Sequence, residues 1–250
     1  MTHKVESANS ARDATDATFC INTAMIFAAG HGKRMRPLTD TTPKPLLEAG
    51  GISLIEYHLI KLRQAGILRV VINLHWLSEK ISSTLGDGSK YGVTIEYSDE
   101  TVLLETAGGL VKAIPLLTRQ GNDPFLVVNG DVWSDMDFTV VCHKAQQYLR
   151  AEDLAMLVMV NNPTQHPCGD FALNHSRLEM GTEQETLTYS GVGVYRPRIV
   201  HGLNEEPASL GPLLRKAITN GQIAGWHFTG KWSDVGTPQR LAQLQEALGK

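Results

Sequence analysis

The sequence contains little cysteine, and the three cysteines it has lie far apart. Cys20, Cys142 and Cys168 are odd in number and widely spaced. Small secreted scaffolds depend on closely spaced cysteines in even numbers. The scarcity therefore argues against a disulfide framework and favours a reducing compartment, and we expect a cytoplasmic protein.

Long hydrophobic runs and a strong net charge are also missing. No window holds the roughly 18 uninterrupted apolar residues that a membrane-spanning helix needs. The formal net charge of −3 gives no general attraction to nucleic acid or to an anionic membrane. Residues 1–20 are mostly polar and lack the apolar centre of a secretory signal, so we expect a disordered leader there. We therefore expect neither a nucleic acid nor a membrane as a partner.

What the sequence does contain is a regular alternation of apolar runs and amphipathic segments. Strands are predicted at 24–28, 69–74, 93–97, 125–129 and 154–160, and helices at 53–65, 76–85, 108–114 and 137–149. Ser53 and Glu56 form a capping-box pattern at the start of the first helix. After about residue 161, strands at 171–173, 186–194 and 225–228 dominate until a helix at 239–248. The pattern predicts a three-layer α/β fold with helices on both faces of a mixed, mainly parallel central sheet.

The first predicted strand runs into a loop that combines glycines with cations. The segment 24–39 reads AMIFAAGHGKRMRPLT, and PKPL follows at 43–46. Glycine lets backbone N–H groups approach phosphate closely, and arginine and lysine neutralise its charge. One residue separates Gly30 from Gly32, which excludes a P-loop, and Met35 replaces the third glycine of a dinucleotide motif. The loop therefore predicts a different kind of polyphosphate site, with a basic surface loop as the alternative.

Two aspartates follow apolar segments farther along the chain. Asp131 comes after the buried strand 125–128 in the sequence Asn-Gly-Asp, and Asp234 lies in KWSDVGT at 231–237. Two carboxylates and a triphosphate offer the oxygen ligands that Mg²⁺ prefers. The alternative for each is an ordinary turn or helix-cap aspartate. Ligands of open α/β sheets bind beyond the carboxyl ends of strands, so we expect the Gly30 loop, Asn73, residues 105–109 and Asp131 to meet in one crevice.

Taken in order, these motifs resemble those of the sugar-1-phosphate nucleotidylyltransferases. The resemblance starts at about residue 24 and includes the glycine loop, 43–45, 130–131 and WSDVGT at 232–237. It implies a Rossmann-like, GT-A-like fold, Mg²⁺ as cofactor, and the reaction of an NTP with a sugar 1-phosphate to give an NDP-sugar and pyrophosphate. The segments 104–109, 129–133 and 187–191 are most similar to members of the family that use UTP and N-acetylmuramic acid 1-phosphate in peptidoglycan recycling.

The resemblance also implies a role for individual residues. Arg34 is expected to hold the pyrophosphate portion, Lys44 the α-phosphate region, and Asp131 with Asp234 the Mg²⁺; Arg34, Lys44 and Asp131 are the expected catalytic residues. The expected nucleotide contacts are Ala28, Ala29, Gly30, Gly32, Lys33, Arg34, Glu100, Glu105 and Gly108. The expected sugar contacts are Asn73, Glu105, Gly109, Asn129, Asp170, Ser190 and Gly191.

The same reading predicts one domain over residues 21–250, which forms a monomer or a small homo-oligomer. We expect a nucleotide-binding lobe at about 21–135, a sugar-binding lobe at about 136–230 and a C-terminal helix at 237–248. We expect none of the further domains that several relatives carry after this helix.

The sequence departs from the family pattern at one point. Many relatives hold the sugar phosphate with a second lysine in a Glu-Lys-Pro segment, and residues 171–188 contain no lysine. Arg177, the metal or backbone groups could replace it.

Other functions remain open at this stage. A nucleotide-sensing module would keep the pocket without turnover, and the sugar 1-phosphate could be of the glucose or mannose type. A glycosyltransferase would need an Asp-x-Asp metal pair. Asp135 and Asp137 have that spacing, but we interpret them as a loop residue and a helix cap.

Overall fold

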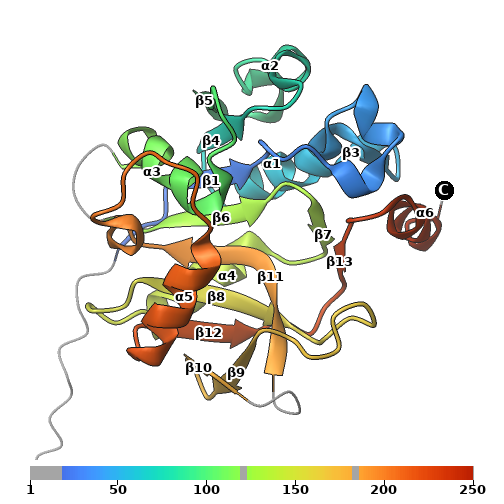
Figure 1. Cartoon of the computed structure of the whole chain (residues 1–250). Helices are drawn as coiled ribbons and strands as arrows, with labels where there is room; N and C mark the ends of the chain where they lie inside the picture. Colours follow the sequence, from blue (N-terminus) through green and yellow to red (C-terminus); the bar gives the residue numbers. More distant parts are fainter. Residues whose placement is uncertain (1–18, 119–122, 182–185, 250) are drawn as a thin grey trace, which may run out of the picture.

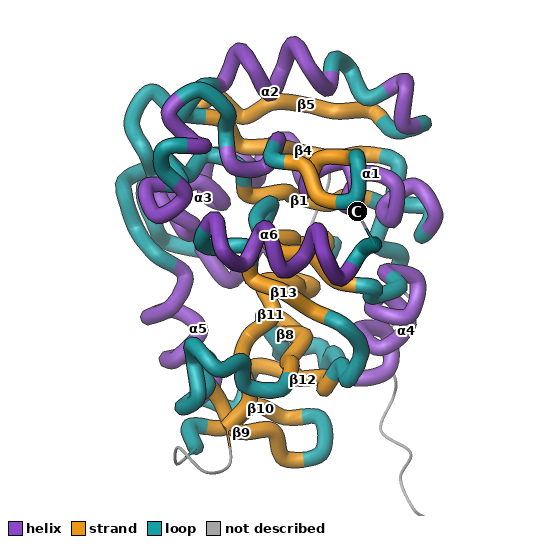
Figure 2. The backbone as a smooth tube through the Cα atoms, turned by 90° about the vertical axis from the view of Figure 1, so that its right-hand side faces the viewer, coloured by secondary structure: helices purple, strands orange, loops and turns teal. Residues whose placement is uncertain are grey.

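The computed structural model describes residues 19–118, 123–181 and 186–249 of the 250-residue chain. Its centre is a nine-stranded sheet in the order β5-β4-β1-β6-β11-β8-β12-β10-β9. The first four strands are parallel, β11 runs antiparallel to both of its neighbours β6 and β8, and β12 is parallel to β8. Figure 2 shows the sheet from β5 at the top to β9 and β10 at the bottom. The predicted mixed α/β architecture is confirmed.

The elements have the following bounds. The strands of the large sheet are β1 (Thr23–Phe27), β4 (Arg69–Leu74), β5 (Thr94–Asp99), β6 (Phe125–Asn129), β8 (Ala155–Val160), β9 (Phe171–Asn174), β10 (Arg177–Glu179), β11 (Thr186–Tyr195) and β12 (Ile223–His227). Two small sheets pair β2 (Glu48–Ala49) with β3 (Ile52–Ser53) and β7 (Val132–Ser134) with β13 (Trp232–Asp234). The helices are α1 (Leu54–Gln64), α2 (Ser78–Leu85), α3 (Glu105–Leu117), α4 (Phe138–Tyr148), α5 (Leu210–Thr219) and α6 (Pro238–Ala247).

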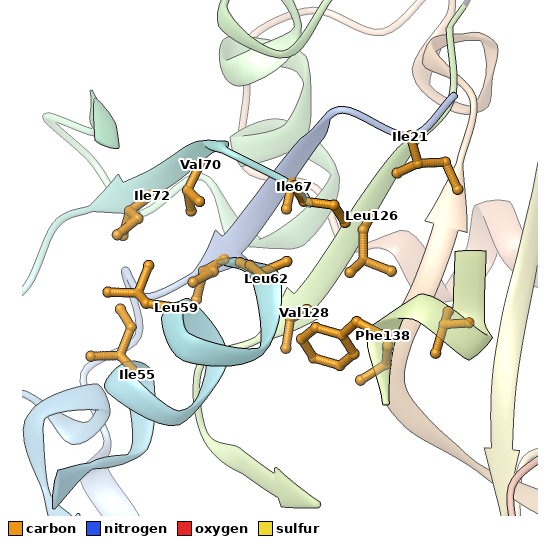
Figure 3. Packing of buried hydrophobic residues seen from close by; sticks show 14 of the residues in the cluster. Ile21, Ile55, Leu59, Leu62, Ile67, Val70, Ile72, Leu126, Val128 and Phe138 are labelled. Atoms are coloured by element: carbon orange, nitrogen blue, oxygen red, sulfur yellow. The ribbon is translucent and has the colours of Figure 1, made fainter. Parts of the chain in front are cut away.

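Hydrophobic side chains cover both faces of the sheet, as expected for a three-layer fold. Successive residues of a strand point to opposite faces, so Ala24 and Ile26 of β1 join one core cluster and Met25 joins the other. The first cluster packs under α1, α2 and α4, and the second packs under α3 and α5 (Figure 1). Figure 3 shows Ile55, Leu59 and Leu62 of α1 facing the strands. These three side chains belong to the buried face of the helix, which lies within the predicted range 53–65.

A third and smaller hydrophobic cluster connects the two ends of the chain. It consists of Met35, Leu47, Ala49, Leu54, Val235, Leu241 and Leu244, all buried. Helix α6 lies beside β13 in this region (Figure 2). The cluster thus fixes the glycine loop to the C-terminal segment.

Local sequence signals decide most of the boundaries. The predicted capping box forms, because the Ser53 backbone N–H donates to Glu56 Oε2 at 3.0 Å and α1 begins at Leu54. Helix α5 was not predicted, although Leu210, Leu214, Ala217 and Ile218 form its buried face. Gly211 and Pro212 in its first turn look like a loop, yet proline is tolerated there because the first N–H groups of a helix have no partner within it.

The predicted domain limits fall as follows. Most of the expected leader lies outside the described residues, but Phe19 stacks on Arg196, whose guanidinium carbon lies 5.3 Å from the ring centroid. One sheet runs through both expected lobes, since β6 pairs with β11, and the division into lobes stays a prediction. Among the helices of the described residues, none is long and apolar enough to span a membrane.

A buried histidine in α1 makes the stability of the fold depend on pH. His58 is 2% exposed and stacks on Phe138. Burial, followed by the charge of Lys61, lowers the pKa of His58 to about 4 from its ordinary 6.5. The unfolded chain then binds more protons between these values, so stability is lost as the pH falls from 6.5 to 4.

We expect this effect to reach roughly 3 kcal/mol. The free energy of unfolding of His58→Gln, measured by urea denaturation from pH 7.5 to 4.5, should fall less steeply with acid than that of the wild type. Equal slopes for the two proteins would contradict the assignment.

Candidate active site

Two adjoining cavities lie beyond the carboxyl ends of the parallel strands. The larger, of about 340 Å³, is lined by Phe27, Ala28, Ala29, Gly30, Pro45, Asn73, Leu103, Glu105, Thr106, Asn129, Asp131 and Ser209. Strand register explains this gathering, because Phe27 at the end of β1 is level with both Asn73 of β4 and Asn129 of β6. The predicted crevice thus forms around the end of β1, and the side chain of Asp131 completes it.

The smaller cavity, of about 210 Å³, is rich in charge. Its lining residues are Gly32, Lys33, Arg34, Lys44, Asp131 and Gly236. In the part of the chain that the structure describes, Lys33 and Arg34 are exposed and form no ion pair, so both are available to an anion. Lys44 is only 8% exposed. Asp131 borders both cavities and therefore lies at their junction.

Local contacts fix the backbone conformation of the glycine loop. Gly32 has a φ of 61°, a left-handed conformation that favours glycine, and its carbonyl oxygen accepts a hydrogen bond from the Thr39 hydroxyl at 2.9 Å. The Trp76 indole N–H in turn donates to the Thr39 carbonyl oxygen at 3.2 Å. These contacts tie the loop to the end of β4, so that Lys33 and Arg34 project from a fixed backbone.

The loop carries an excess of positive charge. His31 packs against the rings of His75 and Trp76, with centroid distances of 5.4 Å and 5.2 Å. Partial burial, and then the charges of His75, Lys33 and Arg36, lower the pKa of His31. The positive charges of Lys33 and Arg36 near His31 suit this region to a polyanion.

The two predicted metal ligands lie on neighbouring backbone segments. Asp234 ends β13 opposite Val132 of β7, and the Val235 N–H donates to the Asp131 carbonyl oxygen at 3.0 Å. Each carboxylate pairs with a cation: Lys44 Nζ is 2.5 Å from Asp131 Oδ2, and Arg240 Nη1 is 2.6 Å from Asp234 Oδ2. Among the described residues no group of three or more His, Cys, Asp or Glu could hold a metal. The donor set therefore fits Mg²⁺ only when phosphate oxygens complete it.

A buried network supports the wall of the larger cavity. The Ala28 N–H donates to Asn73 Oδ1 at 2.8 Å, and Asn73 Nδ2 donates to Glu100 Oε1 at 2.7 Å. Glu100 Oε2 also accepts the Leu104 N–H at 2.9 Å. The carboxylate of Glu100 is 5% exposed and does not line the cavity. It joins the segment after β1 to the start of α3, so its influence on a nucleotide would be indirect.

Replacing Glu100 with glutamine should destabilise the protein by about 1–3 kcal/mol. One of the two acceptor oxygens becomes a donor, which leaves either the Leu104 N–H or the Asn73 amide facing another N–H group. Urea denaturation measures the effect, and Glu96→Gln, which loses only a half-exposed contact with Arg69, is the control. Equal losses in the two variants would contradict a special role for the network.

Two of the predicted contact residues, Gly108 and Gly109, lie behind the cavity wall. The Gly108 N–H donates to the Ala208 carbonyl oxygen at 3.2 Å, and a side chain at Gly108 would collide with the Glu206 backbone. Gly109 backs onto the Glu100 carboxylate, which would lie 2.7 Å from an added Cβ. Both glycines thus allow close packing behind the wall, and a direct contact with substrate stays a prediction.

The predicted sugar contacts on β9 and β11 are only partly brought to the cavity. Gly191 has a φ of 79°, where β11 shifts register against β8, and it packs on the Asn129 amide that lines the cavity. Ser190 is fully buried and its hydroxyl accepts the Val192 N–H at 3.1 Å. Asp170 Oδ2 accepts the Tyr189 N–H at 2.8 Å. Ser190 and Asp170 are therefore engaged within the protein and do not line either cavity.

Two further expectations are settled by the structure. The suggestion that Arg177 could hold the sugar phosphate is wrong, because its guanidinium pairs with the buried Asp153 at 2.5 Å and with the Gly221 carbonyl oxygen. The interpretation of the Asp-x-Asp pair is confirmed. Asp137 Oδ1 caps α4 by accepting the Thr139 N–H at 2.7 Å, and Asp135 Oδ1 accepts the Lys231 N–H at 2.8 Å.

Two residues at the site were not predicted. Ser209 lines the larger cavity, and Arg240 pairs with Asp234. Ser209 is brought there by α5, the unpredicted helix that it precedes, and the Leu210 N–H donates to the Thr106 hydroxyl at 2.8 Å. Glu105 adopts a φ of 57° at the start of α3, which is rare for a residue other than glycine and often marks a functional position. The sequence signal for Glu105 was its position after the predicted strand 93–97.

Comparisons with known sequences agree with this geometry. The Nucleotidyl transferase family matches residues 23–171. The chain is 49% identical over 231 residues to N-acetylmuramate alpha-1-phosphate uridylyltransferase of Neisseria meningitidis serogroup B, covering 90% of this chain and 98% of that protein. It is 34% identical over 238 residues to the protein of the same name in Caulobacter vibrioides, covering 91% and 97%.

A solved structure confirms the fold. HddC from Yersinia pseudotuberculosis, complexed with GMP-PN, superposes with a TM-score of 0.74 at 16% identity and covers 91% of this chain and 99% of that one. This likeness concerns the fold alone, whereas the matches to the two relatives cover 90% and 91% of this chain, and the family match at residues 23–171 includes the glycine loop and Asp131. The chain therefore belongs to the nucleotidyl transferase family, among the enzymes that transfer a nucleotidyl group to a sugar 1-phosphate.

Proposed function

We propose that this enzyme transfers the uridylyl group of UTP to N-acetylmuramic acid 1-phosphate and releases pyrophosphate, with Mg²⁺ as cofactor. The observation that carries the proposal is the arrangement of two adjoining cavities, one largely uncharged and one rich in cations, with Asp131 at their junction. A nucleoside and a sugar suit the first, and a triphosphate suits the second. The choice of substrates is supported by the names of the relatives that are 49% and 34% identical.

The cations of the smaller cavity would place and neutralise the triphosphate. Lys33 and Arg34 project from the glycine loop, where backbone N–H groups add further donors. Arg34 can bind two phosphate oxygens through its planar fork, and Lys44 acts as a point charge beside Asp131. We assign the β- and γ-phosphates to Arg34 and the α-phosphate to Lys44.

The reaction needs no nucleophile from the protein. An oxygen of the sugar phosphate attacks the α-phosphorus, and the bond to the pyrophosphate oxygen breaks on the opposite side. Catalysis then consists of holding the two phosphates in line and stabilising the charge that develops. Mg²⁺ held by Asp131 and Asp234 would supply positive charge shared between the phosphates. Asp131 directly precedes β7 and Asp234 ends β13, and the third hydrophobic cluster packs Met35 of the glycine loop with Val235, the residue after Asp234.

The proposed sugar has a lactyl carboxylate that glucose-type sugars lack. Burying this group requires donors, since an unpartnered charge is costly to remove from water. Arg177 and the Gly108 N–H are already engaged in the protein. The Ser209 hydroxyl and the first N–H groups of α3 at Glu105 and Thr106 border the larger cavity and are the donors that we propose.

A substrate panel tests the proposal. UTP, dTTP, GTP and ATP are each combined with the 1-phosphates of N-acetylmuramic acid, N-acetylglucosamine, glucose and mannose, and pyrophosphate release is recorded with Mg²⁺ or with EDTA. We expect UTP with the muramic sugar to give the highest kcat/KM, and EDTA to abolish turnover. Equal or better use of glucose or mannose 1-phosphate would overturn the substrate assignment while leaving the reaction class intact.

The same panel separates the alternative functions. A nucleotide-sensing module would bind UTP without releasing pyrophosphate, and a glycosyltransferase would consume the UDP-sugar. We place the reaction in peptidoglycan recycling in the cytoplasm, because N-acetylmuramic acid is a peptidoglycan sugar and nucleoside triphosphates are cytoplasmic substrates.

A further inference from the structure

The residue preferences of an α-helix do not explain why an arginine stands at position 240 of α6. Thr237 caps this helix, so Arg240 stands in its first turn. A cation is unfavourable there because the N-terminus of a helix carries partial positive charge, and glutamate or glutamine is preferred three residues after the cap. The guanidinium is nevertheless mostly buried, with 16% of the side chain exposed. A residue that breaks a local rule in this way often serves a site.

The surroundings of the guanidinium connect it to the smaller cavity. Nη1 lies 2.6 Å from Asp234 Oδ2. Nη2 packs directly on Gly236, where any side chain would collide with it, and Gly236 lines the smaller cavity. Arg240 thus lies behind the wall formed by β13 and Gly236, whereas Lys33, Arg34 and Lys44 come from the glycine loop and the segment after it.

Each of the two predicted metal ligands forms an ion pair before any metal enters. Lys44 pairs with Asp131 and Arg240 pairs with Asp234, so each carboxylate already has a cation. A divalent cation that binds both carboxylates must compete with both ion pairs. Once it has done so, the guanidinium of Arg240 loses its partner and needs a new anion, because an unpaired and mostly buried charge is costly.

We propose that Arg240 is a substrate-binding residue, whose guanidinium passes from Asp234 to a phosphate oxygen of the sugar 1-phosphate when a divalent cation binds the two aspartates. The inference rests on the proposed function. In-line displacement requires the attacking phosphate and the departing pyrophosphate to lie on opposite sides of the α-phosphorus. The cations of the glycine loop serve the pyrophosphate side, whereas Arg240 comes from α6 and lies behind Gly236, which lines the same cavity.

The exchange also makes metal binding depend on phosphate. Without phosphate, the divalent cation must displace Arg240 and leave it unpaired, so affinity is low. With a phosphate present, the guanidinium gains a new partner and the metal gains oxygen ligands. Metal and phosphate should therefore bind with positive coupling, and Arg240 should set part of that coupling.

The experiment compares the wild type with Arg240→Gln and Arg240→Lys. Arg150→Gln, at an exposed position, is the control for the same change of charge. Binding of Mn²⁺ to the nucleotide-free protein is measured by calorimetry. We expect Arg240→Gln to bind Mn²⁺ about tenfold more tightly, because Asp234 is released from a charge-assisted contact. Arg240→Lys should lie between the wild type and Arg240→Gln, and it also serves if the glutamine variant does not fold.

Steady-state kinetics with UTP and N-acetylmuramic acid 1-phosphate provide the second measurement. Arg240→Gln should raise the KM for the sugar phosphate at least about tenfold while the KM for UTP changes much less. Unchanged Mn²⁺ affinity, an unchanged KM for the sugar phosphate, or equal increases in both KM values would each overturn the inference while the wild type remains active. A wild type without turnover would overturn the proposed function itself, and with it the assignment to the sugar phosphate.

Discussion

Replacing Asp131 with asparagine is expected to lower kcat by about 10²-fold or more, because the variant loses a proposed metal ligand and the partner of Lys44. Asp131 borders both cavities and pairs with Lys44 at 2.5 Å. The amide keeps the size of the side chain but not its charge, so the metal is held less tightly and less charge is neutralised in the transition state. Asp234→Asn should behave in the same way.

Pyrophosphate release at saturating substrates measures this loss. Asp137→Asn is a matched control, since asparagine caps a helix as well as aspartate and Asp137 only caps α4. Folding of Asp131→Asn should survive, because the side chain is more than one-third exposed. Near-normal Mg²⁺-dependent turnover in either Asp131→Asn or Asp234→Asn would show that the replaced residue is not a ligand.

Lys44→Ala is expected to cost about 2–4 kcal/mol of transition-state stabilisation, as charge-assisted contacts to phosphate do when they are removed. Lys44 is 8% exposed, and its ammonium lies at the rim of the smaller cavity next to Asp131. Negative charge develops around the α-phosphorus during the displacement, so the loss should appear mainly in kcat. Arg34→Ala should fall in the same range.

The kinetic parameters of Lys44→Ala are to be compared with those of Lys90→Ala, which removes an exposed lysine bonded to the Thr84 carbonyl oxygen. A loss confined to the KM for UTP would mean that Lys44 binds ground state and transition state equally. Unchanged kinetics in Lys44→Ala and Arg34→Ala would leave the glycine loop as ordinary basic surface.

Local signals in the sequence determine the parts of the fold that could be predicted. The capping box at Ser53 and the apolar runs 69–74 and 125–129 depend on neighbours in the chain, and the structure has these elements where they were expected. The pairing of β7 with β13 could not be predicted, because each strand has three residues and their partners are about a hundred positions apart. Short strands form only when tertiary contacts support them.

The candidate site likewise combines residues that local sequence patterns predict with residues that only tertiary contacts bring together. Gly30, Asn73, Glu105 and Asp131 were predicted to meet because each lies near or after the carboxyl end of a strand, and all four line the larger cavity. Ser209 and Arg240 reach the site through helices that pack from the other end of the chain, which no local pattern reveals. The suggestion for Arg177 was wrong for the same reason, because no local sequence pattern indicates that Arg177 pairs with Asp153.

The hydrophobic cluster that joins Met35 to Leu241 and Leu244 has a consequence for synthesis of the protein. The N-terminal part of the chain leaves the ribosome first. The strands of the first half can therefore pair while the rest of the chain is still being synthesised. Met35 of the glycine loop, however, packs in one cluster with Leu241 and Leu244 of α6, and Gly236 lines the smaller cavity. We therefore expect that a nascent chain does not complete the proposed triphosphate site until α6 has left the ribosome.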